Sequence, residues 1–404
     1  MNQRQPQSDP PHLVWVCAES LIDKLHAATW LDTTHELREM DWRVTLIAAG
    51  PAGHQCVRGV EVRCIPKPQL YLIGQVAFHA RLLRFLAEEW GTIDVILYHS
   101  TSAPWVLPLQ LVRRLSGKRR PMLVMDTRTL HMIPESKESW KDRIRRPFHE
   151  LMGRLANRWA DGRLAISQRM AKSLHIPPDK LWGVWPSGVD LGRFAPAQVA
   201  RRWPCAEEPI HVIYIGCLHH ERNLLTLSRA VKKANAEGMQ FTLSLVGDGT
   251  ERADLERFAD QTAGQIRVMP PVPHDEVWKL LAQADIGVLP FPDEEKFQVS
   301  SPVKLFEYMA AGLPILATRI ACHTDVVGDG EYVFWAEQAD VPGLLAGLRL
   351  IWQDRECLSK MGSQASTAAE GWTWRASAEK LKRSLEYGLA NCALSAESVG
   401  DGCP

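Results

Sequence analysis

The sequence lacks several features that would place it quickly in a class of protein. Its nine cysteines include no C-x-x-C pair and no regular spacing, which argues against a zinc site and a disulfide framework. The 47 basic and 47 acidic residues cancel, so net charge does not favour a nucleic-acid partner. No apolar run approaches the roughly 18 residues that indicate a membrane-spanning helix. These absences favour a globular protein of a reducing compartment, and we expect a cytoplasmic location.

The two ends of the chain also lack apolar signals. Residues 1–11 are polar and rich in proline, and the apolar run after them is too short for a signal-peptide core. The carboxyl-terminal segment 391–404 is expected to be a flexible tail. With 404 residues, 46% of them hydrophobic, the chain is long enough for two domains.

Short apolar runs rich in β-branched residues alternate with longer segments of helical period. The amino-terminal half contains HLVWVCAE, RVTLIAAG, DVILYHS and PMLVMDT, and the carboxyl-terminal half contains HVIYIG, FTLSLVG, IGVLP and PILAT. Strands that are apolar on both faces and separated by helices are typical of a parallel sheet covered on both sides. The predicted fold class is therefore α/β, with two doubly wound, Rossmann-like domains.

The segment GVDLGRFAPAQVARRWPCAEEP lies between the two halves and is rich in glycine, proline and charge. This composition is typical of an interdomain linker. We therefore expect a first domain over residues 1–195, a linker over 196–208 and a second domain over 209–372. Two facing domains of this kind place a ligand cleft between them.

The stretch SSPVKLFEYMAAGLPILAT, residues 300–318, places the carboxylate of Glu307 inside an apolar run. Ser301 is a favourable N-cap, Pro302 suits the first helical position and Gly312 suits the C-terminal stop. The pattern predicts a helix between these signals. In an open parallel sheet the ligand lies beyond the carboxyl ends of the strands. The free N–H groups at the start of this helix could therefore hold a diphosphate without a metal.

Glu307 has two interpretations at this point. One to two turns into the helix, its carboxylate could accept two hydrogen bonds from a vicinal diol such as a ribose. Alternatively, Glu307 pairs with Lys304 at i, i+3 on a solvated face, a contact worth about 0.2–0.5 kcal/mol. The spacing alone leaves both open.

Taken together, the turns of the carboxyl-terminal half resemble those of a known family. IGCLHHERNLLTLSRAV, VGDGTERADL and ADIGVLPFPDEEKFQVSSPVKLFEYMAAGLPILAT resemble donor-binding segments of the retaining glycosyltransferases of family 4, also called the group 1 family, which have the two-domain GT-B fold. WPSGVDLGRFAP resembles the family's interdomain phrase. GWTWRASAEKLKRSLEYGL resembles its closing helix, expected over 373–390 and returning to the first domain. The resemblance covers most of the chain from about Met122 onward.

The resemblance implies a nucleotide-sugar site in the second domain. Arg222 matches the basic position of the turn that holds the donor diphosphate, and its alternative role is a surface partner of Glu221 or another carboxylate. Gly247 could let the backbone approach a nucleotide or could serve an ordinary turn. The implied catalytic residues in this domain are Arg222 and Glu307. The implied donor-binding residues are Gly216, Arg222, Gly247, Ser300, Ser301, Lys304 and Glu307.

In the first domain, MDTRTLHM places Asp126, Arg128 and His131 just past a predicted strand end. Family members often have a histidine in this region that contacts the transferred sugar, and His131 is the catalytic candidate. His99, at the end of the preceding predicted strand, competes with it. An imidazole can donate or accept a proton near neutral pH, although a single histidine is often structural. His99, Asp126 and Arg128 are the acceptor-side candidates.

The sequence departs from the usual family pattern at three places. Val299 stands where the first of two glutamates, eight positions apart, is usually found. The chain instead has the Ser-Pro-x-Lys-x-Phe-Glu-Tyr-Met-Ala form of a subset of the family. Cys217 replaces a basic residue often found after the first glycine. CAESLIDKLHAATW follows the first predicted strand in place of a glycine-rich loop.

The segment WKDRIRRPFHELMGRLANRWADGR combines apolar residues at helical spacing with five arginines. A basic amphipathic helix of this kind, here over residues 140–160, can lie on an anionic membrane. An ordinary surface helix has the same pattern when its apolar stripe faces the core. The apolar residues are Ile144, Phe148, Leu151, Leu155 and Trp159, and the basic ones are Arg143, Arg145, Arg146, Arg154 and Arg158.

The function that the resemblance implies is transfer of a hexosyl group from a nucleotide sugar to a glycan, lipid-linked or small-molecule hydroxyl, with retention of configuration, in glycan or glycolipid biosynthesis. No Asp-x-Asp motif occurs in a suitable place, so no metal and no other cofactor is expected. Two alternatives remain: a non-catalytic sugar-nucleotide-binding scaffold of a polysaccharide assembly complex, and a GT-B sugar-nucleotide epimerase. If the acceptor is lipid-linked, we expect the protein to be peripheral to the inner face of the membrane.

Overall fold

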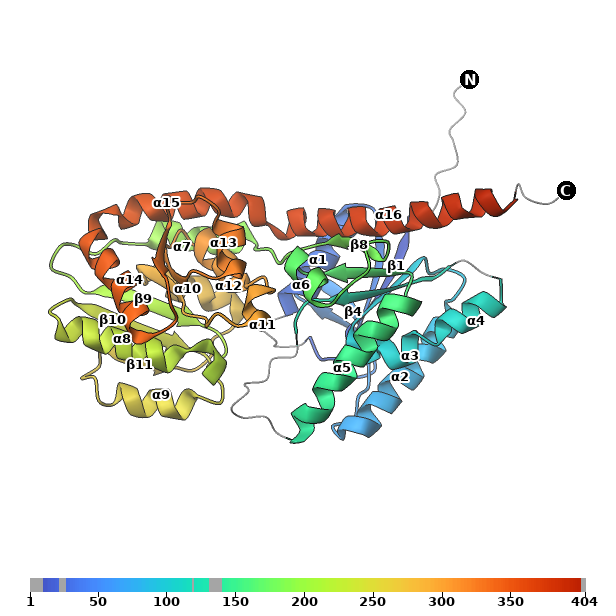
Figure 1. Cartoon of the computed structure of the whole chain (residues 1–404), viewed down its shortest axis with the longest axis horizontal. Helices are drawn as coiled ribbons and strands as arrows, with labels where there is room; N and C mark the ends of the chain where they lie inside the picture. Colours follow the sequence, from blue (N-terminus) through green and yellow to red (C-terminus); the bar gives the residue numbers. More distant parts are fainter. Residues whose placement is uncertain (1–9, 22–26, 118–119, 131–139, 401–404) are drawn as a thin grey trace, which may run out of the picture. The chain divides into compact units, whose positions relative to one another are not determined.

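The computed structural model describes residues 10–21, 27–117, 120–130 and 140–400 and divides the chain into two compact units (Figure 1). The first unit contains the chain up to Pro186 together with the helix that begins at Trp374, and the second is Ser187–Thr373. Each unit has its own sheet with helices on both faces (Figure 1). The predicted α/β class with two doubly wound domains is confirmed.

The sheet of the first unit has eight strands in the order β3-β4-β2-β1-β5-β6-β7-β8. Its neighbouring strands are parallel, except for an antiparallel hairpin of β3 and β4 at one edge. The strands are β1 (His12–Val16), β2 (Arg43–Ala49), β3 (Gly53–Val57), β4 (Val60–Ile65), β5 (Val95–Tyr98), β6 (Met122–Thr127), β7 (Gly162–Ala165) and β8 (Leu181–Val184).

Strand β3 was not among the predicted strands, because its sequence GHQCV is polar and mostly exposed. Its pairing depends on the turn to β4, where Arg58 (φ 50°) and Gly59 (φ 77°) both have left-handed backbones. Two-residue hairpins use such residues. The Arg58-Gly59 pair was therefore the sequence signal from which this hairpin could have been predicted.

Two helical layers cover the first sheet. Helices α1 and α16 pack on one face and contribute to the core that contains Trp15 and Trp185, while α2, α3 and α5 pack on the other face. The closing helix begins one residue later than expected and continues through the segment predicted to be a tail, as far as Gly400. The helices are α1 (Ala28–Glu39), α2 (Tyr71–Glu88), α3 (Ala103–Val106), α4 (Leu109–Leu115), α5 (Trp140–Trp159), α6 (Gln168–Ser173) and α16 (Trp374–Gly400).

The sheet of the second unit has six parallel strands in the order β11-β10-β9-β12-β13-β14. Helices α8, α9 and α14 pack together on one face, and α7, α10, α12 and α15 pack on the other (Figure 1). The strands are β9 (Ile210–Ile215), β10 (Phe241–Val246), β11 (Ile266–Met269), β12 (Ile286–Leu289), β13 (Ile315–Thr318) and β14 (Val333–Ala336). The helices are α7 (Leu191–Ala200), α8 (Leu224–Ala236), α9 (Arg252–Ala259), α10 (Val277–Ala282), α11 (Glu295–Gln298), α12 (Val303–Ala310), α13 (Ala321–Val327), α14 (Val341–Gln353) and α15 (Leu358–Ala369).

The segment predicted to be a linker is an integral part of the second unit. Asp190 caps α7 by accepting the N–H of Arg193 at 3.2 Å, and Phe194 is buried in the second core. Arg201 donates to the carbonyl groups at the ends of α10 and α12, at distances between 2.5 and 3.1 Å. The units therefore divide after Pro186 and not near residue 195. Helix α7 has only ten residues and contains glycine and proline, so its apolar periodicity is weak and its composition is that of a linker.

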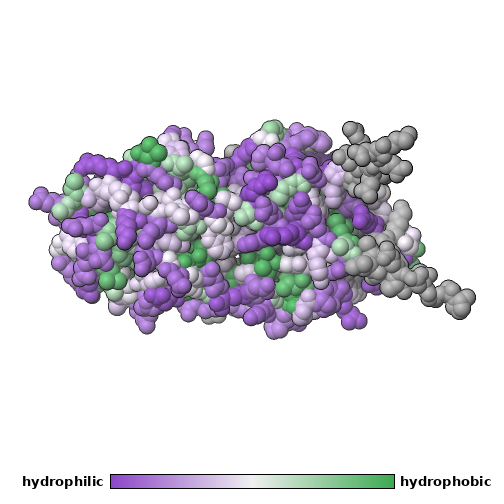
Figure 2. Space-filling model, turned by 90° about the horizontal axis from the view of Figure 1, so that it is seen from above, coloured by the Kyte–Doolittle hydropathy of each residue, from purple (hydrophilic) through white to green (hydrophobic). Residues whose placement is uncertain are grey.

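Figure 2 shows a face on which hydrophobic residues lie in small patches between hydrophilic ones. Within the described part of the chain, no helix is both long and apolar enough to cross a membrane.

Candidate functional site: the carboxyl edge of the second sheet

The sheet of the second unit has a topological switch point between β9 and β12. Successive strands are added on one side of β9 as far as β11 and on the other side from β12 onward. In open α/β sheets, ligands bind beyond the carboxyl ends of the strands at such a point. Gly216 and Arg222 follow β9, while Lys304 and Glu307 lie on α12, the second of two helices between β12 and β13. The implied donor residues thus gather at one edge of this sheet.

Helix α12 matches the predicted helix to within one residue at each end. The prediction that Ser301 is the N-cap is wrong. Pro302 occupies that position, and no side chain caps the helix. Within the described chain, the backbone N–H groups of Val303 and Lys304 have no hydrogen-bond acceptor. A helix start with unsatisfied N–H groups carries a partial positive charge and favours a bound anion.

The two serines before α12 are engaged within the chain. Ser301 Oγ accepts the N–H of Ser187 at 3.0 Å, and Ser187 Oγ donates to the Ser301 carbonyl at 3.2 Å. Ser300 Oγ donates to the Phe297 carbonyl at 2.8 Å. Both hydroxyls therefore hold the approach to α12 in place, and the N–H groups of the helix start are the remaining donors there.

The two glycines of the site are required by close packing. Gly216 (φ 146°) faces the Lys304 side chain, and a Cβ at Gly216 would lie 2.1 Å from Lys304 Cε. A Cβ at Gly247 (φ 148°) would lie 1.8 Å from the Gly216 carbonyl oxygen. The N–H groups of Gly216 and Gly247 donate to Val246 and Met269 carbonyls at 2.8 and 3.0 Å. These glycines thus shape the turns and admit Lys304, while their own N–H groups continue the sheet.

Lys304 is a partly buried cation beside the Gly216 turn. Its Nζ lies 5.7 Å from the centroid of the Tyr214 ring, and no carboxylate of the described residues lies within 4.0 Å of it. Burial, together with the nearby positive charge of Arg222, lowers the pKa of Lys304. An anion bound here would relieve both effects, because it would supply the missing opposite charge.

Arg222 lies in the 3₁₀ helix His220–Arg222 that follows β9. Its guanidinium carbon is 5.2 Å from the Phe291 ring centroid and 5.3 Å from that of Phe297. The two rings are stacked with centroids 4.9 Å apart, so they form an apolar wall beside the cation. Although Arg222 follows β9 and Lys304 lies on α12, the two cations are close enough for Arg222 to lower the pKa of Lys304.

Glu307 is held by a histidine. Its Oε1 lies 2.9 Å from His274 Nε2, and the side chains of Glu307 and His274 are only 13% and 8% exposed. The alternative that Glu307 pairs with Lys304 on a solvated face is wrong, since the Glu307 side chain is mostly buried and its hydrogen-bond partner among the described residues is His274. Burial of a carboxylate is costly unless it is hydrogen-bonded, which explains why it has this partner.

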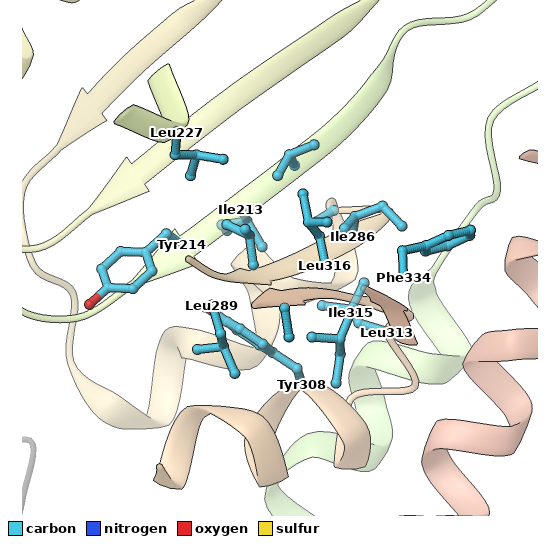
Figure 3. Close-up of a cluster of buried hydrophobic side chains, with 14 of the residues drawn as sticks. Ile213, Tyr214, Leu227, Ile286, Leu289, Tyr308, Leu313, Ile315, Leu316 and Phe334 are labelled. Atoms are coloured by element: carbon cyan, nitrogen blue, oxygen red, sulfur yellow. The ribbon is translucent and has the colours of Figure 1, made fainter. Parts of the chain in front are cut away.

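Tyr308 fixes the rotation of α12 about its axis. Figure 3 shows its ring pointing from α12 into the apolar cluster below the strands, near Leu289. The ring packs against Gly287, where a Cβ would lie 2.5 Å from it, and its hydroxyl accepts the N–H of Ile215 at 3.2 Å. With Tyr308 buried in this way, Lys304 and Glu307 are carried at the edge of the buried face of α12.

In the first unit, the acceptor-side candidates form a polar group at the carboxyl ends of β5 and β6: His99 follows β5, Asp126 lies within β6 and Arg128 follows it. His99 Nδ1 lies 3.2 Å from the Asp126 carbonyl oxygen, and Asp126 Oδ1 accepts the Trp185 Nε1–H at 3.3 Å. Arg128 donates to the Trp185 carbonyl at 3.0 Å, with its guanidinium carbon 3.6 Å from the centroid of the Trp185 ring. Burial lowers the pKa of His99 and lowers that of Arg128 to about 10.

Two atoms of this group lack hydrogen-bond partners among the residues that the structure describes, namely His99 Nε2 and Asp126 Oδ2. Buried polar atoms are nearly always satisfied, which makes these two atoms candidates for contact with a ligand. The catalytic candidate His131 lies outside the described residues.

The helix predicted from the arginine-rich segment is α5. Its residues Phe148, Leu151 and Trp159 are 36%, 51% and 48% exposed, while Met152 and Ala156 face the core. Leu155 is partly buried against that core, and the side chain of Ile144 lies outside the described set. Most of the described apolar stripe therefore does not face the core. This contradicts the interpretation of the segment as an ordinary surface helix whose apolar stripe is buried.

Sequence reasoning missed His274, which contacts α12 across 33 residues, and Ser187, which contacts Ser301 just before α12 across 114 residues. The only sequence signal for His274 was its place in the turn MPPVPHDEV after a predicted strand, where site residues are expected. Within the described ranges, no group of three or more His, Cys, Asp or Glu side chains is arranged to hold a metal ion.

Two family sequence models match the chain, one in each half. The model described as "Glycosyltransferase Family 4" matches residues 27–193, and the one described as "Glycosyl transferases group 1" matches residues 209–354. Among curated proteins, the phosphatidyl-myo-inositol mannosyltransferase of Mycolicibacterium smegmatis is 24% identical over 330 residues, which cover 80% of this chain and 79% of that protein.

Solved structures with the same architecture cover almost the whole chain. Sucrose-phosphate synthase from Thermosynechococcus elongatus has a TM-score of 0.73 at 15% identity, over 95% of this chain and all of that one (100%). Anabaena HepE, solved in complex with UDP and glucose, has a TM-score of 0.68 at 16% identity, over 93% and 99%. At these identities the likeness concerns the fold, which is GT-B. Since family models match both halves and the fold agrees over nearly the full length, the chain is a family 4-like glycosyltransferase.

Proposed function

We propose that the protein transfers a sugar from a nucleotide-sugar donor to an acceptor hydroxyl and that the second unit binds the donor. One observation carries this proposal. Two cations, Arg222 and Lys304, lie at the turn beside a helix start with unengaged N–H groups, and the buried carboxylate Glu307 follows one turn later. A nucleotide sugar offers the complementary pattern of a diphosphate between two sugars with hydroxyl groups.

The charges at this edge suit the leaving group of the reaction. When the bond from the sugar to the diphosphate breaks, negative charge develops on the diphosphate oxygen. Arg222, Lys304 and the start of α12 would stabilise that charge without moving, because they are already in place. A cation pair and a helix start can take the role that Mg²⁺ has in other sites, so the proposal includes metal-independent transfer.

Glu307 would accept hydrogen bonds from the vicinal hydroxyls of the donor ribose. His274 engages Oε1, and among the described residues this is the hydrogen bond that the Glu307 side chain makes, so Oε2 is left for a ligand. An ionised carboxylate offers about four lone-pair sites, so two donors can still be accepted. Hydrogen bonds to a charged acceptor contribute about 1.5–3 kcal/mol each.

The transferred bond is proposed to keep its anomeric configuration, with the departing diphosphate accepting the proton of the acceptor hydroxyl on the same face. The named relatives support a nucleotide-linked donor: one is a mannosyltransferase and another was solved with UDP and glucose. We place the reaction in glycan or glycolipid biosynthesis, in the cytoplasm. The base and sugar follow from the binding experiment below.

The acceptor is proposed to contact the polar group of the first unit. His99 Nε2 and Asp126 Oδ2 are the buried atoms without partners there, and Arg128 adds a positive charge. The exposed apolar residues of α5 alternate with exposed arginines, including Arg154 and Arg158. This pattern supports peripheral membrane contact and a lipid-linked acceptor.

One observation favours a second candidate, a non-catalytic sugar-nucleotide-binding scaffold. Val299 is 3% exposed, so an apolar side chain is buried where the resemblance would place a first glutamate. A scaffold of this kind would bind the nucleotide sugar as the enzyme does and would not turn it over.

The test measures thermal unfolding and calorimetric binding of purified protein against UDP, ADP, GDP and their sugar derivatives, with EDTA present. A ligand at 100 times its dissociation constant raises the free energy of unfolding by about 2.7 kcal/mol. We expect one nucleotide family to stabilise wild type, and Glu307→Ala to lose most of that stabilisation. Glu337→Ala is the matched control, because Glu337 is an exposed carboxylate of the same unit paired with Arg319.

Incubation of the identified nucleotide sugar with candidate acceptors then separates the two functions. Transfer in EDTA, with the product configuration read by NMR, supports a metal-independent retaining enzyme. Binding without release of nucleoside diphosphate identifies the scaffold. If no nucleotide stabilises wild type, or if Glu307→Ala responds as wild type does, the assignment of the donor site is wrong.

A further inference from the structure

We propose that His274 is a positioning residue of the donor site, which orients the Glu307 carboxylate toward the donor hydroxyls and is itself oriented by Arg193. This inference rests on the proposed function, because it requires Glu307 to bind the donor. It assigns a role to a residue outside α12 and to a helix that composition would classify as linker.

Three side chains form a hydrogen-bonded row. Arg193 donates through a terminal nitrogen to His274 Nδ1 at 3.1 Å, and His274 Nε2 lies 2.9 Å from Glu307 Oε1. Arg193 also lies 3.4 Å from the carboxylate of Asp190, the residue that caps α7. The edge of the His274 ring packs against Phe194 at a centroid distance of 6.1 Å. The row therefore links the first turn of α7 to α12.

The chemistry of the row determines the tautomer of the imidazole. A guanidinium group can only donate hydrogen bonds, so His274 Nδ1 must accept. The proton of the neutral ring is then on Nε2, which donates to Glu307 Oε1. The direction of both bonds is thus set by Arg193, the one member of the row that cannot change its role.

Fixing one oxygen of Glu307 orients the other. A free glutamate side chain samples several rotamers, and ordering it on ligand binding costs conformational entropy. With Oε1 bound to His274, the carboxylate is already ordered and Oε2 keeps its lone pairs for the ligand. The same logic holds for metal sites, where residues behind the ligands hold them in orientation.

The alternative is that His274 only packs against Phe194 and shields the site. The two roles predict opposite rankings of two variants by their affinity for the donor. His274→Gln keeps an amide N–H donor near the position of Nε2, while His274→Leu keeps apolar volume and removes the donor. If His274 positions Glu307, the glutamine variant binds the donor better than the leucine variant. If His274 only packs, the leucine variant performs as well or better.

The experiment compares calorimetric affinities of the nucleoside diphosphate that binds wild type with those of its 2′,3′-dideoxy analogue. The variants are His274→Gln, His274→Leu, Arg193→Met and Glu307→Ala. His211→Leu is the matched control, because it removes a partly buried histidine of the same unit whose ring, within the described chain, bonds Gln283 and Ser244 and no residue of the donor site. Unfolding midpoints of all variants are recorded so that loss of fold is recognised separately.

We expect His274→Leu to weaken binding of the ribonucleotide about tenfold and His274→Gln to stay within about threefold of wild type. Arg193→Met should fall between them, since it releases the tautomer while keeping the ring. For the dideoxy analogue, all variants should bind within about twofold of wild type, because the hydroxyls that Glu307 receives are absent.

Several outcomes would overturn the inference. Equal affinity of His274→Leu and wild type for the ribonucleotide, with Glu307→Ala weakened, removes His274 from the site and leaves the proposed function standing. A loss in His274→Leu that persists with the dideoxy analogue assigns it a packing role. If wild type binds no nucleoside diphosphate, the proposed function and this inference are both wrong.

Discussion

The amino ends of the two sheets are alike in detail. In the first unit, His12 donates its backbone N–H to Asp94 at 2.8 Å, while its ring contacts the Thr92 carbonyl through Nδ1 and Thr45 Oγ1 through Nε2. In the second unit, His211 makes the same three contacts with Asp285, Gln283 and Ser244. Asp94 directly precedes β5, which pairs with β1, and Asp285 directly precedes β12, which pairs with β9. Burial lowers the pKa of both histidines.

The carboxyl ends of the two sheets differ. In the second unit, glycines and the cations Arg222 and Lys304 surround a helix start with free N–H groups. In the first unit, His99, Asp126 and Arg128 are buried around Trp185. The two units thus share the same histidine contacts at the amino ends of their sheets. They differ at the carboxyl ends, where the strands continue into turns. The candidate residues of each unit thus lie at the carboxyl edge of its sheet, where ligands bind in open α/β sheets.

Substitution of Lys304 should give the largest effect of the difference between the carboxyl ends of the two sheets. Lys304→Met should weaken nucleoside diphosphate binding about 100-fold, roughly 2.7 kcal/mol, because a partly buried charge-assisted contact is lost. The free protein should not lose stability, since burial disfavours this cation and Arg222 repels it. Calorimetry for affinity and thermal unfolding for stability measure the two effects.

Two controls sharpen this test. Lys279→Met removes an exposed lysine of the same unit that pairs with Glu276, and it should leave affinity unchanged. Arg128→Met, in the first unit, should slow sugar transfer without weakening nucleoside diphosphate binding. A large loss of nucleotide affinity in Arg128→Met would contradict the division of roles between the units.

In each unit, a buried histidine with a strongly lowered pKa makes stability sensitive to acid. Burial lowers the pKa of His79 and of His323 to about 4 from the usual 6.5. Between these values the unfolded chain binds a proton that the folded chain does not, so stability rises with pH across this window and is lost as pH falls. At pH 5 each histidine should reduce the free energy of unfolding by about 2 kcal/mol relative to pH 8.

Hydrogen exchange followed by mass spectrometry distinguishes the two units in this experiment. His79→Gln should flatten the pH dependence of protection in β1 and β5 and leave that of β9 and β12 unchanged, while His323→Gln should do the reverse. Equal flattening of both units by either variant would show that the units unfold together.

The likeness of the amino ends predicts the smallest effect. Since each ring Nδ1 faces a carbonyl, it must donate, and Nε2 accepts the hydroxyl proton of Thr45 or Ser244. Thr45→Val and Ser244→Ala should therefore each lower the free energy of opening measured by hydrogen exchange by about 1 kcal/mol, and only in the unit that carries the substitution. Costs that differ by more than twofold would show that the shared geometry hides different energetics.

Much of the fold and part of the site follow from local sequence. Alternation of apolar strands with helical segments predicts both parallel sheets, and proline and glycine signals locate α12 within a residue at each end. Arg222, Lys304 and Glu307 could be assigned to one edge because parallel strands release their turns on the same side. Strand β3 was missed since its pairing depends on a turn and not on apolar residues.

The sequence by itself determined most of the elements, the two sheets and the edge at which the candidate site lies, because periodicity and end signals act over a few residues. Only the tertiary structure decided what holds the site: His274 on Glu307, Ser187 on Ser301, and α7 in the second unit in place of a linker. These contacts join residues far apart in the chain. A buried polar group accepts whichever partner packing brings within reach, and no local pattern encodes that choice.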